Sequence, residues 1–146
     1  MPAIRRLALH LLKQAPELRA LSRWSEVVLV LTDDDGIAPL NRAFLGVPAP
    51  TDVISFAYGP LPGETGPGSG EVFVNAERAW QLGRTVPRAS HELALYVAHG
   101  LNHLTGASDH APRLRARMRR QELAWLKRAE ASGCLGGLFA DRRGRR

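Results

Sequence analysis

The chain alternates between apolar residues at helical spacing and short β-branched runs, which predicts helices interspersed with strands. The first helix is indicated by a set of apolar residues near the N-terminus, namely Ile4, Leu7, Ala8 and Leu11. Short runs rich in β-branched or apolar residues predict three strands, at 27–32, 51–56 and 71–74. The Gly/Pro-rich segment 59–70 is expected to form the loop between the last two strands.

Two shorter helices are predicted from the capping residues at their ends. The aspartates at 33–35 supply an N-cap and first-turn carboxylates for a helix that ends at Gly46. Three consecutive aspartates could also form a metal cluster, but the start of a helix is enough to explain them. Asn75 caps a further helix, which Gly83 closes.

Two longer helices are predicted in the C-terminal half. Ser90 is the expected N-cap of a helix that runs to about Thr105. Ser108 or Asp109 is expected to begin the last helix, which Gly133 breaks. The whole pattern predicts an α+β fold, in which a small mixed sheet packs with about five helices.

Length and composition indicate one domain with a short tail. The chain has 146 residues, of which 45% are hydrophobic, so a single domain over 1–140 can bury a core. Residues 141–146 are predicted to be a disordered basic tail. No apolar run reaches the length of a membrane span, and the single cysteine, Cys134, favours a cytoplasmic location.

Charge is distributed unevenly along the chain. Residues 1–110 carry a net charge of −2, whereas residues 111–146 carry +8, and 18 of the 20 basic residues are arginine. Guanidinium groups suit bidentate contacts with phosphate. The basic C-terminal quarter therefore favours a nucleic-acid partner, against the alternative of a solvated helix face and a soluble tail.

The histidines are the strongest chemical signal in the sequence. His99 and His103 are four residues apart, so their imidazoles converge if they lie on a helix. Gly106 allows the chain to turn back, and His110 on the returning segment can supply a third nitrogen. Three protein ligands with an open fourth position are typical of a catalytic zinc. The sequence therefore predicts a three-histidine site for one Zn²⁺ per chain, at the end of the central helix.

One class of metal-dependent hydrolase is disfavoured at this site. Zincin proteases need a glutamate immediately after the first histidine as general base, and the residue here is Gly100. This glycine either leaves room beside the metal for a bulky substrate or permits a close helix crossing.

Several segments together resemble one known family. The segment 99–110 is similar to an HGxLHLxGxDH signature, and residues 40–56 are similar to an LNxxyRGxxxPTDVLSF segment. Gly70 and Glu71 open a segment that matches a GDI strand, and Glu92 matches an acidic residue before the histidines. On these residues, over about 25–120, the chain resembles the YbeY-type endoribonucleases, also called rRNA maturation factors.

The resemblance carries expectations about the activity and the site. It implies a single-domain α+β fold, a zinc held by His99, His103 and His110, and single-strand-specific hydrolysis of RNA. The implied role is maturation of the 16S rRNA 3′ end and ribosome quality control, with single-stranded rRNA and the small ribosomal subunit as partners.

Three positions depart from the family's pattern. Six residues separate His103 from His110, where the family has five, and the extra residue falls in a loop. Leu45 stands where the family has an arginine that would stabilise the charge of the transition state. Arg42, one helical turn earlier, is the candidate catalytic replacement. Asn102 occupies a position that is apolar in the family.

Other interpretations stay open on the sequence alone. A non-catalytic ribosome-biogenesis protein could keep the fold and the zinc, and another metal-dependent hydrolase could act on a small ester or peptide. Asp109 could orient a ligand imidazole or cap the last helix. Ser55 could line a cleft or be an ordinary strand residue. Only some arginines of the last helix can face an RNA backbone, among Arg113, Arg115, Arg117, Arg119 and Arg120.

Overall fold

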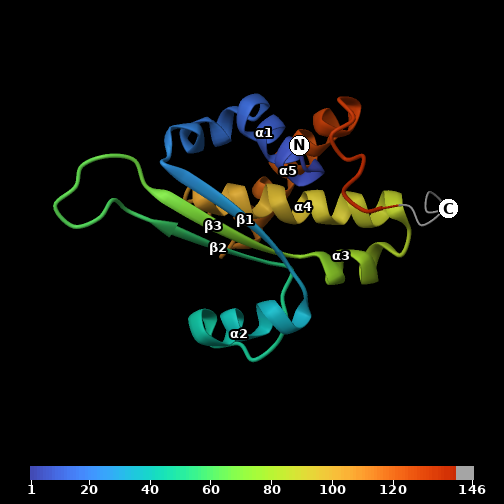
Figure 1. Cartoon of the computed structure of the whole chain (residues 1–146), viewed down its shortest axis with the longest axis horizontal. Helices are drawn as coiled ribbons and strands as arrows, with labels where there is room; N and C mark the ends of the chain where they lie inside the picture. The colour runs from blue at the N-terminus through green and yellow to red at the C-terminus, as the bar shows by residue number, and fades with distance from the viewer. Residues whose placement is uncertain (141–146) are drawn as a thin grey trace.

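The computed structural model describes residues 1–140, and the tail predicted at 141–146 lies outside this range. In chain order the elements are α1 (Ala3–Gln14), the 3-10 helix η1 (Pro16–Arg23), β1 (Glu26–Thr32), α2 (Asp34–Leu45), β2 (Val53–Tyr58), β3 (Ser69–Asn75), α3 (Ala76–Gly83), α4 (Val86–Leu104) and α5 (Pro112–Ala131). This arrangement confirms the predicted α+β class with a small mixed sheet (Figure 1).

The three strands lie in the order β1-β3-β2, with β3 in the centre. β1 pairs with β3 in parallel and β2 pairs with it antiparallel. Side chains along β3 alternate between the two faces, so Val72 and Val74 are buried on one face while Glu71 and Phe73 belong to the other. β2 is therefore an edge strand, with one side free of strand partners.

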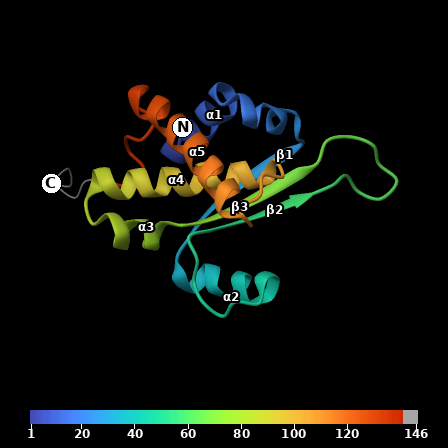
Figure 2. The same cartoon turned by 180° about the vertical axis from the view of Figure 1, so that it is seen from behind.

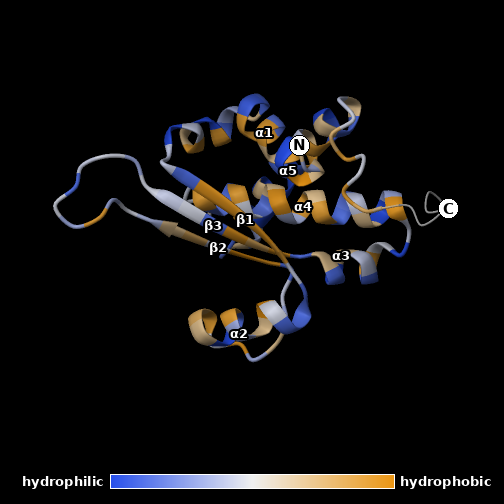
Figure 3. Cartoon of the chain, viewed as in Figure 1, coloured by the Kyte–Doolittle hydropathy of each residue, from blue (hydrophilic) through white to orange (hydrophobic). Residues whose placement is uncertain are grey.

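The central helix α4 covers one face of this sheet. Two opposite views show α4 between the sheet and a layer made of α1 and α5 (Figures 1 and 2). Most of its residues are buried in one apolar core with Val72 and Val74 of β3, and hydrophobic residues recur along α4 and the strands (Figure 3). This double covering explains why α4 is apolar on more than one side.

Gly100 is the point at which α4 approaches the sheet most closely. A Cβ built on Gly100 would overlap the Val72 side chain, and it would also press on Val53 and Ser55. The Ser55 hydroxyl donates a hydrogen bond of 2.8 Å to the Gly100 carbonyl oxygen. The structure therefore supports the packing explanation of this glycine, with the sheet as the element that lies close to α4. The hydrogen bond from Ser55 joins the strand to the helix.

Helix α2 packs on the opposite face of the sheet and lies apart from the other helices (Figure 1). Its C-terminal part is attached by edge-on aromatic contacts, with ring centroids 4.8 Å apart for Phe44 and Phe56 and 5.9 Å apart for Phe56 and Phe73. At its N-terminus the Asp33 side chain accepts a hydrogen bond of 2.8 Å from the Gly36 backbone N–H. This cap confirms that the aspartates at 33–35 mark the start of a helix.

The predicted starts of the two long helices were wrong. α4 begins at Val86 with Thr85 as its N-cap, so Ser90 is buried inside the helix. Pro87 is accommodated in the first turn of α4, because a proline there has no intrahelical hydrogen bond to lose. α5 begins at Pro112, so neither Ser108 nor Asp109 caps it, and residues 105–111 form a loop.

Candidate metal centre

Two histidines meet on one face of α4 near its C-terminal end. The Nε2 atoms of His99 and His103 lie 3.0 Å apart, and the ring planes are nearly perpendicular at 84°. The four-residue spacing places both imidazoles on the same side of the helix, as the sequence predicts. Both side chains are half-buried, at the edge of the core.

Asp109, in the loop after α4, completes a cluster with these two histidines. Its Oδ2 atom lies 3.4 Å from His103 Nε2 and 3.7 Å from His99 Nε2. Ligand atoms around a tetrahedral zinc are separated by about 3.3 Å, given metal–ligand distances of about 2.0–2.1 Å. The separations of 3.0, 3.4 and 3.7 Å therefore fit a divalent metal ion held by two imidazoles and a carboxylate.

His110 does not join this cluster. It is exposed, and its backbone N–H donates a hydrogen bond of 3.3 Å to the Ser108 hydroxyl. Five residues separate His103 from Asp109, which is the spacing that the resembling family has between its second and third ligands. The family's spacing of five residues matches Asp109, whereas the prediction of a third imidazole selected the next residue, His110. Ligation by His110 stays a prediction.

The far side of each imidazole is held by a hydrogen bond. His99 Nδ1 contacts both carboxylate oxygens of Glu122 at 2.9 and 3.0 Å, and His103 Nδ1 lies 3.1 Å from the Ala107 carbonyl oxygen. When Nδ1 carries the proton, Nε2 presents its lone pair to the cluster. These contacts orient both rings for metal binding.

Glu122 is the functional residue that the sequence analysis missed. It lies on α5, is only 2% exposed, and also accepts a hydrogen bond of 3.0 Å from the Asn102 side chain. This contact explains the polar residue at 102, which supports the carboxylate behind His99. Since Glu122 lies 23 residues from His99, no local spacing connects the two.

Carboxylates dominate the electrostatics around the histidines. Burial lowers the pKa of His99, but the hydrogen bond and charge of Glu122, with smaller contributions from Asp52 and Asp109, outweigh it and raise that pKa above the usual value. The same negative charges favour a bound cation between the two rings.

Two hollows adjoin the cluster. One is a groove that follows β2 from the histidines to the end of α2, and its lining includes Phe44, Leu45 and Phe56. The other is a pocket formed by α3, α4 and α5, which is lined by three arginines, Arg78, Arg115 and Arg119. His99 and Asp109 border both hollows, so the candidate metal site is accessible from two sides.

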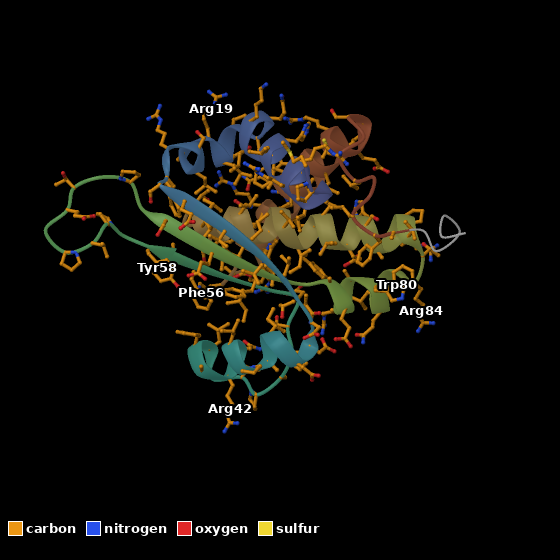
Figure 4. All side chains as sticks on the ribbon, viewed as in Figure 1. Arg19, Arg42, Phe56, Tyr58, Trp80 and Arg84 are labelled. Carbon is orange, nitrogen blue, oxygen red and sulfur yellow. The ribbon has the colours of Figure 1, made fainter. Side chains whose placement is uncertain are left out.

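Arg42, the candidate catalytic cation, is not brought to the histidines. It is exposed on α2, and its side chain points away from the rest of the molecule (Figure 4). Leu45, at the position of the family's arginine, lines the groove beside the cluster and is 63% exposed.

Comparison with known proteins identifies relatives over most of the chain. The sequence profile of the family described as Endoribonuclease YbeY matches residues 1–130. A protein named Endoribonuclease YbeY from Anaeromyxobacter sp. is 41% identical over 131 residues, covering 88% of this chain and 66% of the relative. One of the same name from Rhodopirellula baltica is 41% identical over 102 residues, covering 66% of this chain and 50% of the relative.

A solved structure supports the same fold. The Thermotoga maritima protein TM1509 superposes with a TM-score of 0.55 at 22% identity, covering 99% of this chain and 92% of that one.

The matched part of the chain spans two thirds or less of the length of the two relatives named above. Within the described residues, no helix is long and apolar enough to cross a bilayer. With the profile matched over residues 1–130, the chain belongs to the YbeY endoribonuclease family.

Proposed function

We propose that this protein is a zinc-dependent, single-strand-specific endoribonuclease that matures the 3′ end of 16S rRNA and takes part in ribosome quality control. The observation that carries the proposal is the cluster of His99, His103 and Asp109 at the junction of two open hollows, in a chain of the YbeY family. The proposed partners are single-stranded rRNA and the small ribosomal subunit, and the proposed location is the cytoplasm.

The donor set fits one zinc per chain. His99 and His103 would hold it through Nε2 and Asp109 through Oδ2, while Glu122 and the Ala107 carbonyl keep the imidazoles in place. A zinc ion bound to three protein ligands supplies Lewis acidity and acidifies a water molecule. The role of the chain itself is to orient these donors and to leave space beside them for a phosphodiester.

One observation favours a non-catalytic alternative. The groove carries Leu45 where the family has an arginine, and Arg42 points into solvent. If the reacting phosphate lies in this groove, whose lining contains no lysine or arginine, the protein could bind rRNA and zinc during ribosome biogenesis without cleaving the RNA.

The test compares cleavage and metal content in the wild type and two variants. A labelled single-stranded RNA and its duplex are each incubated with zinc-loaded wild type, His103→Ala and the control His91→Ala, a histidine of α4 outside the cluster. We expect the wild type and His91→Ala to cut only the single strand, and His103→Ala to lose both bound zinc and cleavage.

Other outcomes identify the alternatives. If zinc-loaded wild type leaves the RNA intact but binds the small ribosomal subunit, the non-catalytic function replaces the proposal. Cleavage of a small ester or peptide without cleavage of RNA would point to another hydrolase. Leu45→Arg tests the missing cation, since a gain in cleavage would show that the position limits the activity.

A further inference from the structure

The pocket formed by α3, α4 and α5 brings together arginines that are distant in sequence. Arg78 comes from α3, whereas Arg115 and Arg119 lie one turn apart on α5 and share one face of that helix. The same pocket is lined by His99 and Asp109, so the three arginines share a pocket with two residues of the candidate metal centre.

These guanidinium groups have unused hydrogen-bonding capacity. Within residues 1–140, the side chains of Arg78 and Arg119 make no hydrogen bond or ion pair, and Arg115 makes a single one, from Nη1 to the Asp109 carbonyl oxygen at 3.1 Å. Each guanidinium offers five N–H donors in a planar fork. Arg115 is thus tied to the backbone of a cluster residue with most of its donors free.

Most of the acidic residues in the pocket are already engaged. Glu122 accepts hydrogen bonds from His99 and Asn102, and Asp109 belongs to the metal cluster. Asp52 accepts a hydrogen bond of 2.8 Å from the backbone N–H of the following residue. The remaining carboxylate, Glu92, pairs with none of the arginines. The pocket therefore has donors to spare.

A neutral donor lies in the same pocket. Tyr96 is 4% exposed, and its buried hydroxyl lies close to the Glu92 carboxylate, without a hydrogen bond of normal geometry among the described residues. Burial, followed by the nearby charges of Glu92 and Asp52, raises the pKa of Tyr96, so the hydroxyl keeps its proton. The lining thus combines three cations with a protonated hydroxyl.

The groove on the other side of the cluster offers no such cations. Its lining along β2 and the end of α2 contains no lysine or arginine and includes the apolar side chains of Phe44, Leu45 and Phe56. Of the two hollows, only the pocket on the α5 side therefore offers guanidinium groups to a phosphate beside the metal cluster, among four carboxylates that a bound divalent metal ion would partly offset.

We propose that Arg78, Arg115 and Arg119 bind the backbone phosphates of the single-stranded RNA substrate in the pocket beside the metal centre. This proposal rests on the proposed function in taking RNA as the ligand, but it concerns binding and requires no cleavage. Planar guanidinium groups form paired, charge-assisted hydrogen bonds with phosphate oxygens, and those on α5 are held on one helix face.

Helix α5 itself provides a matched control for the test. Arg115→Ala/Arg119→Ala removes two charges at an i, i+4 spacing from the face that lines the pocket. Arg113→Ala/Arg117→Ala removes two charges at the same spacing from positions that do not line it, with Arg117 beside Thr105 and Gly106 instead. All four residues are exposed, so both variants are expected to fold, which thermal unfolding by circular dichroism would verify.

Binding is measured by fluorescence anisotropy with a labelled, 2′-O-methylated single-stranded RNA, whose integrity is checked by gel electrophoresis after each titration, over a range of salt concentrations. Each phosphate contact with a single strand contributes about 0.7 to the slope of log K against log salt. Loss of two contacts should lower that slope by about 1.4 and the affinity by about 25-fold at about 0.1 M salt. Arg78→Ala should lower the slope by about 0.7.

The control decides the outcome. A much smaller loss in Arg113→Ala/Arg117→Ala would support the pocket, whereas equal losses in the two double variants would overturn it in favour of general attraction to the basic helix. Absence of RNA binding by the wild type would also overturn the proposal. A wild type that binds this RNA through the pocket but does not cut unmodified RNA would overturn the nuclease function and leave the binding site standing.

Discussion

The candidate metal centre is built from two regions that differ in how firmly the fold holds them. His99 and His103 lie on α4, a helix packed on one side by the sheet and on the other by α5. Asp109 lies in the loop 105–111, which is attached to its surroundings by a few hydrogen bonds. On a packed helix, spacing alone determines which side chains meet, but in a loop one residue more or less changes the ligand.

The loop is nevertheless tied to the helix at several points. The Thr105 hydroxyl donates a hydrogen bond of 2.6 Å to the Asn102 carbonyl oxygen, and Ala107 accepts one from His103 at 3.1 Å. Gly106 has a φ of 90°, a conformation that favours glycine and turns the chain back toward the histidines. These contacts place the Asp109 carboxylate opposite the imidazoles.

The largest effect is expected from the loop ligand. Asp109→Ala should lower zinc affinity by about 100-fold or more, because loss of a direct ligand should exceed the 10–100-fold cost of losing an outer hydrogen-bond partner. His110→Ala, at the adjacent residue, tests the ligation predicted from the sequence: an unchanged affinity would exclude His110 as a ligand, and a loss would support it. Competition with a chromophoric zinc chelator measures both. Equal losses in the two variants would show that His110 also binds the metal.

A smaller loss of zinc affinity is expected when Glu122, which contacts His99 on the side away from the cluster, is changed. Glu122→Gln keeps the size of the side chain but removes the charge that faces His99 Nδ1, and should lower zinc affinity by about 10–100-fold. Gln121→Glu is the control for charge on this part of α5. If Glu122→Gln binds zinc as the wild type does, the negative charge of Glu122 is not needed to orient His99.

The smallest effect should appear in stability and leave metal binding unchanged. Ser55→Ala removes the 2.8 Å hydrogen bond to the Gly100 carbonyl oxygen and should lower the free energy of unfolding by about 1 kcal/mol. Urea unfolding with Ser132→Ala, an exposed serine, as control would measure this difference. A loss of zinc affinity in Ser55→Ala at unchanged stability would instead assign Ser55 to the site.

The sequence predicted what depends on local periodicity. The strands, the aspartate cap of α2 and the convergence of His99 with His103 each follow from residues close together in the chain. The start of α4 was missed because Thr85 and Ser90 are both capable caps, although Pro87, two residues after Thr85, already favours the earlier start, since proline is common in the first turn of a helix. Glu122 was missed because its partnership with His99 arises from the packing of α5 against α4.

The third residue of the cluster could be predicted from the sequence only in part. A spacing of five residues, as in the family, leads to Asp109, whereas the preference for an imidazole leads to His110, whose ligation stays a prediction. In a loop, the backbone decides which of two adjacent side chains turns inward, and here it turns Asp109 inward and leaves His110 exposed. Residue chemistry alone therefore does not determine a loop ligand.

The contact between Gly100 and the sheet also limits which chemistry this scaffold can acquire. Converting His-Gly-x-x-His into the protease motif His-Glu-x-x-His requires a single substitution in the sequence, but any Cβ at position 100 would collide with Val72. Installing a glutamate there would require the helix to move away from the strands that support both histidines. The packing of α4 on the sheet therefore excludes the metalloprotease motif at this position, whatever metal or substrate is supplied.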